Sequence, residues 1–210
     1  AVAAIVSEAD RSGRDSGTAR TCREYLAVVR QRRDVAATAQ NKLALCARVA
    51  PALVGRRSLV FADTVEQAEA AAVRLVRGGV RAETLHSELT RDRRRIRLAV
   101  FRRGDLEALV APRVLDEGVD VPAADVAVVL AAFRTRRQMT QRLGRVLRVK
   151  PDEGEARLVI TYAEGTAEDP KVGGHRDFLA EVRDVARSVD RFAVGTSASE
   201  LSGWFASHRP

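Results

Sequence analysis

The stretch Ser58-Leu-Val-Phe-Ala-Asp-Thr-Val-Glu-Gln67 contains the start of a strand–helix unit. Its first five residues form a short apolar run, which is typical of a β-strand that is buried on both faces. Thr64 follows as a candidate helix N-cap, and Gln67 stands three residues later, at the spacing of a capping box. A helix is therefore expected to start after Thr64 and to end at Gly78-Gly79, because glycine commonly ends helices.

The same alternation of strand and helix continues through the chain. Further strands are expected at residues 80–86, 107–111, 125–131 and 156–162, and helices at 90–103, 135–147 and 175–190, the last with Phe178, Val182 and Val185 on one face. Strands that alternate with helices form a parallel sheet with right-handed crossovers and helices on both faces. The sequence therefore predicts an α/β fold in which ligands bind at the carboxyl ends of the strands.

Three parts are expected along the chain. Residues 1–54 are predicted to be a linker followed by one or two helices, with a polar run ending near residue 19. Residues 55–165 contain the strand and helix alternation, and residues 166–210 form a helical C-terminal extension in which Trp204 is expected to pack rather than to stack on a base. Because the chain begins at Ala1 without a methionine, we expect it to be a piece of a longer protein.

Composition and charge limit the function only weakly. The formal net charge is +8 and the pI is about 10.6, which fits a polyanionic partner such as nucleic acid. Nearly all of this charge is arginine, so an arginine-rich codon usage explains it equally well. The two cysteines lack metal-binding spacing, and the sequence has no apolar run of the roughly 20 residues that a membrane span needs. A cytoplasmic protein without a membrane partner is expected.

The segment Val110-Ala-Pro-Arg-Val-Leu-Asp-Glu-Gly-Val-Asp-Val-Pro122 follows the third predicted strand and is one candidate for the functional site. Gly118 allows the backbone to approach a ligand closely, and Asp120 can accept hydrogen bonds from sugar hydroxyls. By itself the segment fits a polar turn that ends at Pro122 somewhat better than a ligand site.

A second candidate is the helix that contains Gln138-Met-Thr-Gln-Arg-Leu-Gly-Arg-Val-Leu-Arg148. Arg142, Arg145 and Arg148 recur every three residues, which keeps them near one helix face. Guanidinium groups bind phosphate through parallel donors, although a solvated basic face is the ordinary alternative. Gly144 costs about 1 kcal/mol relative to alanine inside a helix, which favours a close contact there. A further arginine run at residues 91–97 fits a solvated face better than a phosphate contact.

Taken together and in order, these segments resemble the C-terminal RecA-like domain of superfamily 2 helicases, a P-loop NTPase-type three-layer fold. The likeness is greatest to the XPB-like DNA-repair helicases, with the RadD-like group nearby, and it covers about residues 56–163. Residues 58–63 resemble motif IV, residues 110–122 motif V and residues 141–148 motif VI; residues 85–90 resemble the strand and turn that follow motif IV.

The resemblance implies a role for individual residues. Arg145 and Arg148 match arginine fingers that reach the γ-phosphate of ATP. Gln141, Gly118 and Asp120 match positions near the nucleotide, whereas Arg113 and Arg142 match positions along the nucleic-acid path. Pro112 departs from the pattern, since many relatives have Ser or Thr there, and proline offers neither a hydroxyl nor an N–H to a phosphate.

The sequence has no GxxxxGK[ST] phosphate loop and no DEAD or DExH tetrapeptide. By the resemblance, ATP and Mg²⁺ are held mainly by an N-terminal RecA-like lobe that precedes this segment, so the chain alone is expected to be inactive as an ATPase. The function expected is the second motor lobe of an ATP-dependent DNA helicase or translocase. The alternatives are the same lobe of an RNA helicase or of a restriction-type translocase, and a non-enzymatic nucleic-acid-binding module.

Overall fold

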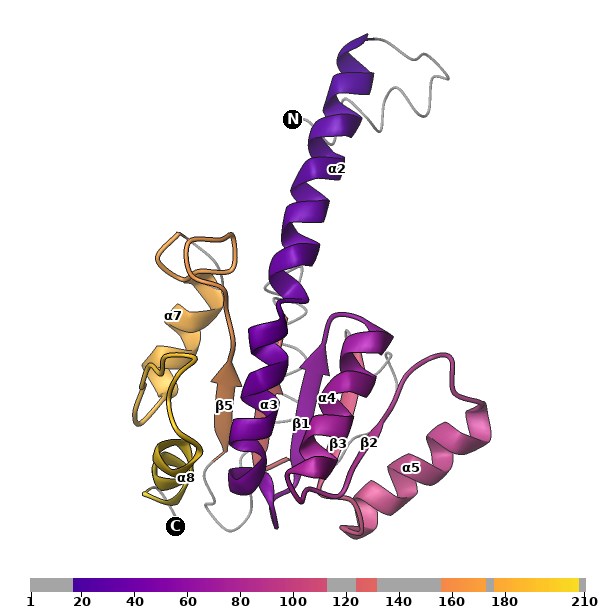
Figure 1. Cartoon of the computed structure of the whole chain (residues 1–210), viewed down its shortest axis with the longest axis vertical. Coiled ribbons are helices and arrows are strands. Elements are labelled where there is room, and N and C mark those ends of the chain that lie inside the picture. The colour runs from indigo at the N-terminus through magenta and orange to yellow at the C-terminus, as the bar shows by residue number, and fades with distance from the viewer. Residues whose placement is uncertain (1–16, 113–123, 132–155, 173–175, 208–210) are drawn as a thin grey trace.

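The computed structural model describes residues 17–112, 124–131, 156–172 and 176–207. In this part of the chain a five-stranded, all-parallel sheet has the order β2-β3-β1-β4-β5. The strands are β1 (Ser58–Ala62), β2 (Ala82–Thr84), β3 (Ala108–Pro112), β4 (Val126–Val129) and β5 (Arg157–Ile160). The helices are α2 (Gly17–Ala37), α3 (Gln40–Leu53), α4 (Val65–Arg77), α5 (Arg91–Arg103), α7 (Arg176–Val185) and α8 (Ala198–Ala206) (Figure 1).

The central strand β1 has the bounds that its apolar run predicts, and all five of its residues are buried. Its side chains alternate between two apolar clusters, as the period of two in a strand requires. Val60 and Ala62 belong to the first cluster, and Leu59 and Phe61 to the second. The sheet is therefore buried on both faces, which confirms the three-layer α/β architecture.

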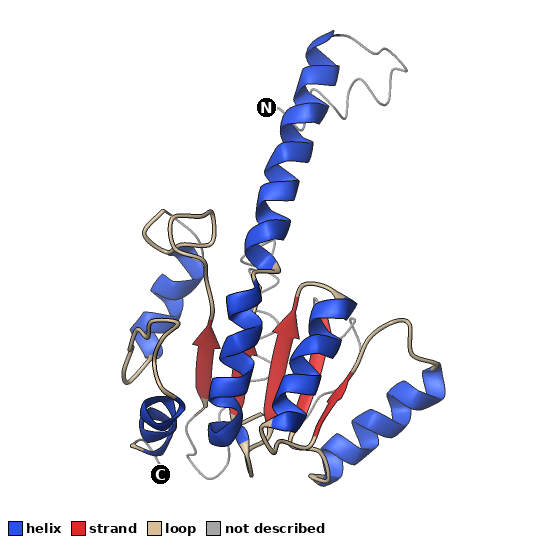
Figure 2. Cartoon of the chain, in the orientation of Figure 1, coloured by secondary structure: helices blue, strands red, loops and turns tan. Residues whose placement is uncertain are grey.

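Helices α3, α4 and α8 supply the first cluster, and α3 and α4 lie side by side in front of the strands (Figures 1 and 2). The predicted start of α4 is confirmed, because the Thr64 hydroxyl accepts a hydrogen bond from the Gln67 backbone N–H at 3.1 Å. Gly78 caps the other end of α4. A Cβ built there would lie 2.3 Å from Cβ of Ala50, so a residue without a side chain allows α3 and α4 to approach each other.

Helices α5 and α7 supply the second cluster through the buried rings of Phe101 and Phe178. The prediction for α5 is confirmed: the Thr90 hydroxyl caps its start, and Gly104 ends it with a φ of +86°. Helix α7 is shorter than predicted. Phe178 and Val182 pack on the second cluster, whereas Val185, the last residue of the helix, is 82% exposed.

Helix α2 extends away from the sheet as a single rod (Figures 1 and 2). Its 21 residues give a length of about 30 Å at 1.5 Å per residue. It starts at Gly17, within the run that was expected to be a linker. Helix α3 shares the apolar core of the sheet, while the proposed divisions at residues 54 and 165 stay predictions.

The C-terminal extension packs on the first face of the sheet. Leu201 and Phe205 of α8 enter the first cluster, and Arg56 donates from Nη2 to the Phe205 carbonyl at 3.1 Å. Trp204 packs as expected: its ring meets the rings of Phe192 and Phe205 edge to face, and its Nε1–H donates to Asp190 at 2.7 Å. The extension therefore completes the core of the α/β domain.

Replacing Phe205 with alanine is expected to lower the free energy of unfolding by about 3–5 kcal/mol, because the ring is 2% exposed and its loss leaves a cavity. Urea unfolding of the 210-residue chain measures this. The control is Val194→Ala, at a side chain that is 52% exposed, with an expected change within about 0.5 kcal/mol. Equal effects of the two substitutions would show that α8 is not part of the core.

Candidate functional site at the carboxyl edge of the sheet

The carboxyl ends of three adjacent strands lie at one edge of the sheet. Ala62 of β1 pairs with Pro112 of β3, and Phe61 of β1 pairs with Val129 of β4. The segment 113–123 therefore leaves the sheet beside the end of β1, and the segment 132–155 leaves on the other side of it, after Ala131. The two segments with the predicted site residues therefore follow β3 and β4, the strands on either side of β1. They start at the edge where parallel α/β sheets bind ligands.

All of the predicted site residues lie outside the described part of the chain, as does the helix expected at 135–147. They are Arg113, Gly118, Asp120, Gln141, Arg142, Arg145 and Arg148. Their roles stay predictions. The structure describes the residues around Pro112 and Ala131, which directly precede the segments 113–123 and 132–155.

Thr161 fixes the backbone just before the second segment. Its hydroxyl lies 3.1 Å from the Val129 carbonyl and 3.0 Å from the Leu130 carbonyl, and its N–H also donates to Val129 at 2.9 Å. Leu130 in turn donates its N–H to the Phe61 carbonyl. The end of β4 is thus bound from both neighbouring strands, which gives the segment 132–155 a rigid origin.

A buried ion pair lies at the same edge of the sheet. Nζ of Lys42, in the first turn of α3, is 2.8 and 2.6 Å from the two carboxylate oxygens of Glu168, and both side chains are 5% exposed. Burial lowers the pKa of the Lys42 ammonium, while Glu168 and, more weakly, Asp63 oppose that shift. The contact of Lys42 with Glu168 holds the loop after β5 against α3.

The loop after β5 is closed by its own side chains. The Asp169 carboxylate accepts from the Gly165 N–H at 2.9 Å and from the Lys171 N–H at 2.8 Å, and these bonds lower the pKa of Asp169. The Thr166 hydroxyl donates to the Ala163 carbonyl at 2.7 Å. The loop is therefore a compact turn that presents Glu168 to Lys42.

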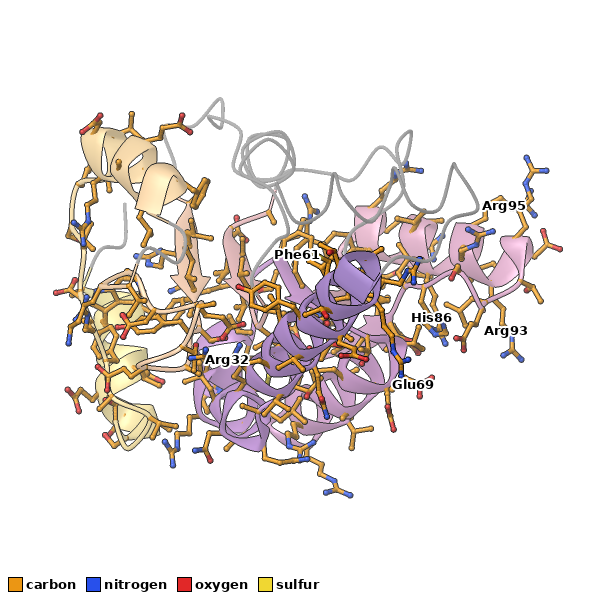
Figure 3. The ribbon with its side chains drawn as sticks, turned by 90° about the horizontal axis from the view of Figure 1, so that it is seen from above. Arg32, Phe61, Glu69, His86, Arg93 and Arg95 are labelled. Atoms are coloured by element: carbon orange, nitrogen blue, oxygen red, sulfur yellow. The ribbon has the colours of Figure 1, made fainter. Side chains whose placement is uncertain are left out.

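An open groove next to the end of β1 is lined by Thr64, Val65, Glu66, Glu69 and Glu88. The His86 side chain, which is 8% exposed, lies beside one of these residues, with its Nε2 3.9 Å from Oε1 of Glu69 (Figure 3). Three carboxylates disfavour a phosphate in this groove, because like charges repel. The groove is therefore a poor candidate for the nucleic-acid backbone.

Helix α5 presents its arginines in two ways. Arg97 is bound inward, with Nη1 donating to the Thr84 carbonyl and hydroxyl at 2.6 and 2.8 Å, and Nη2 lying 3.0 Å from Glu83. Arg93 and Arg95 extend outward from the helix (Figure 3). Arg97 thus holds the helix on the edge strand β2, while Arg93 and Arg95 face solvent.

Three further features of the described residues concern metal ions, membranes and thiol chemistry. No group of three or more His, Cys, Asp or Glu side chains there lies close enough together to hold a metal ion. Within the same ranges, no helix is long and apolar enough to cross a membrane. The Cys46 thiol is buried, and burial raises its pKa to about 12, which makes it unreactive near neutral pH.

The sequence matches a family model described as the helicase conserved C-terminal domain over residues 41–150. This is more than half of the chain, and the chain belongs to that family. Its sheet has the RecA-like architecture of the C-terminal domains of superfamily 2 helicases. The C-terminal domain of the DEAD-box protein Dbp5 aligns with a TM-score of 0.60 at 16% identity, over 82% of this chain and 93% of that one.

Among curated proteins, the chain is similar to XPB-type proteins. The "DNA 3′-5′ helicase XPB" of Kineococcus radiotolerans is 31% identical over 150 residues, which are 71% of this chain and 26% of that protein. The "DNA 3′-5′ translocase XPB2" of Sulfurisphaera tokodaii is 46% identical over 78 residues, which are 37% of this chain and 17% of that protein. The chain thus spans about a quarter or less of the length of these relatives.

Proposed function

We propose that this chain is the C-terminal motor lobe of an ATP-dependent DNA helicase or translocase of superfamily 2. The proposal is carried by one observation: in a chain of this family, the segments with the predicted motif V and motif VI residues leave the sheet at the same edge, one strand apart. In the full-length protein that edge faces a preceding N-terminal lobe, which holds most of the ATP and Mg²⁺ contacts. The names of the XPB-type relatives favour DNA as the nucleic acid.

In this proposal, one group of residues at this edge acts on ATP and another contacts the nucleic acid. Arg145 and Arg148 reach across the cleft between the lobes and stabilise the charge that develops on the transferred phosphoryl group, which is worth roughly 10³–10⁵ in rate in well-studied cases. Gln141, Gly118 and Asp120 contact the nucleotide, and Arg113 and Arg142 contact the nucleic-acid backbone. Because this chain supplies only one wall of the ATP site, it does not turn over ATP alone.

The solvent-facing arginines of α5 extend the nucleic-acid contact. The helix has seven arginines and one acid, Asp92, among its 13 residues. The Arg95 side chain is 79% exposed and only 3.4 Å from Asp92, which is a surface ion pair of small energy. Arg93 and Arg95 are therefore available to phosphates that pass the edge strand β2, where they hold the backbone without reading its sequence.

Replacing Arg93 and Arg95 together with alanine is expected to weaken single-stranded DNA binding by the full-length protein. Each lost phosphate contact on single-stranded DNA lowers the salt dependence of the binding constant by about 0.7 in a log–log plot, so the loss of two contacts should lower the slope by roughly 1.4. Fluorescence anisotropy titrations at several salt concentrations measure it. Arg77→Ala, which removes an exposed arginine near the end of α4, is the control. An unchanged slope in the double variant would remove α5 from the nucleic-acid track.

A further inference from the structure

The Gln67 side chain bridges Asp63 and Ala37, the second of which lies 30 residues before Gln67 in the chain. It is 4% exposed, on the first turn of α4. Its Oε1 accepts a hydrogen bond from the Asp63 backbone N–H at 2.7 Å, and its Nε2 donates to the Ala37 carbonyl at 2.7 Å. Both ends of the amide are therefore used at short distance, and only a side chain with a donor and an acceptor can make both bonds.

The first end of this bridge belongs to the candidate site. Asp63 directly follows Ala62, which pairs with Pro112 at the origin of the segment 113–123. Asp63 is also close enough to Lys42 to affect its pKa. The Asp63 backbone thus lies at the carboxyl edge of the sheet, next to the start of the segment that contains Gly118 and Asp120. A ligand bound at this edge can therefore displace it.

The other end of the bridge is the last residue of α2. Ala36 and Ala37 are buried in its final turn, whereas three large apolar side chains of the same helix are exposed: Tyr25 by 58%, Val28 by 62% and Val35 by 68%. The helix breaks at Ala39, whose ψ is 127°, and α3 starts at Gln40. The direction of α2 is therefore set at this junction, where the Gln67 amide binds the Ala37 carbonyl.

We propose that Gln67 is a positioning residue that couples the carboxyl edge of the sheet to α2, and through α2 to the preceding lobe. This inference rests on the proposed function, in which the N-terminal lobe precedes α2 in the chain. Nucleic acid or nucleotide at the edge moves the backbone at Asp63. Because one rigid amide joins Asp63 to Ala37, the movement changes the direction in which α2 leaves the lobe.

The chain offers a variant that breaks one half of the bridge. In Gln67→Glu the carboxylate keeps the acceptor for the Asp63 N–H but has no donor for the Ala37 carbonyl. We expect ATP hydrolysis by full-length Gln67→Glu to lose at least about fivefold of its stimulation by single-stranded DNA, a typical size for coupling between sites. The KM for ATP should stay within about twofold, because Gln67 is not proposed to touch the nucleotide. Gln67→Met, which loses both bonds, should lose as much stimulation.

Two controls separate coupling from folding. Arg77→Gln, on the exposed last turn of α4, should keep the stimulation. Because Gln67→Glu places a carboxylate in a buried site beside the Ala37 carbonyl, we expect it to be less stable than the natural protein. Thermal unfolding therefore fixes the assay temperature, which is chosen so that both proteins are fully folded. Stimulation of folded Gln67→Glu equal to that of the natural protein would overturn the role of Gln67. If the natural full-length protein itself shows no stimulation by DNA, the proposed function fails instead.

Discussion

Replacing Arg148 with alanine in the full-length protein is expected to lower DNA-stimulated ATP hydrolysis at least about tenfold, and by roughly 10³–10⁵-fold if Arg148 acts as a full arginine finger. The reason is electrostatic: the guanidinium is placed to stabilise charge that grows on the transferred phosphoryl group, and alanine leaves that charge uncompensated. Steady-state hydrolysis at saturating ATP and DNA measures the loss. The KM for ATP should change less than kcat, since the contact strengthens in the transition state.

The matched control for Arg148→Ala is Arg183→Ala, which removes an exposed arginine from α7. Its hydrolysis rate should stay close to that of the natural protein. Circular dichroism and thermal unfolding establish that Arg148→Ala is folded. A folded Arg148→Ala protein that keeps its DNA-stimulated hydrolysis would show that Arg148 is not an arginine finger.

The second large effect is expected on stability. Lys42→Met removes the ammonium that pairs with the buried Glu168 carboxylate, and breaking a buried pair from one side costs about 3–5 kcal/mol. Urea unfolding of the 210-residue chain measures the change. The double variant Lys42→Met/Glu168→Leu removes both charges and should recover most of the loss, because two apolar residues of similar size need no charge compensation.

An exposed ion pair supplies the control for this prediction. Arg20 and Glu24 on α2 are 3.3 Å apart, with side chains 76% and 66% exposed. Arg20→Met should change the free energy of unfolding by less than about 1 kcal/mol, since water screens the pair. If Lys42→Met were as mild as Arg20→Met, the buried pair would not hold the loop after β5 to α3.

The elements that the sequence predicts well are those with local signals at both ends. Helices α4 and α5 are capped at their starts by Thr64 and Thr90 and at their ends by Gly78 and Gly104, as expected. Strand ends were less accurate. Val80 was assigned to a strand, but its N–H donates to the Leu75 carbonyl and completes the end of α4, so β2 starts only at Ala82. The Val80 N–H can bond either to the end of a helix or to a neighbouring strand. The spacing of apolar residues does not indicate which of the two bonds forms.

The order of the motifs predicts the family and which edge of the sheet is functional. The side-chain contacts that hold the backbone at that edge were not predictable, because they join residues that are distant in the sequence. Lys42 and Glu168 are 126 residues apart, and Gln67 reaches Ala37 across 30 residues. Lys42 and Glu168 are types that are mostly exposed in proteins. Only the packing of α3 against the loop after β5 reveals that this pair is buried.

The measurement that tests the central proposal most directly is ATP hydrolysis by the full-length protein with and without single-stranded DNA, beside the same assay on the 210-residue chain. The account predicts DNA-stimulated hydrolysis by the full-length protein, weaker stimulation by RNA of equal length, and no turnover by the chain alone. Stronger stimulation by RNA would reassign the lobe to an RNA helicase. Full-length protein that hydrolyses no ATP with either nucleic acid, or turnover by the isolated chain, would contradict the account.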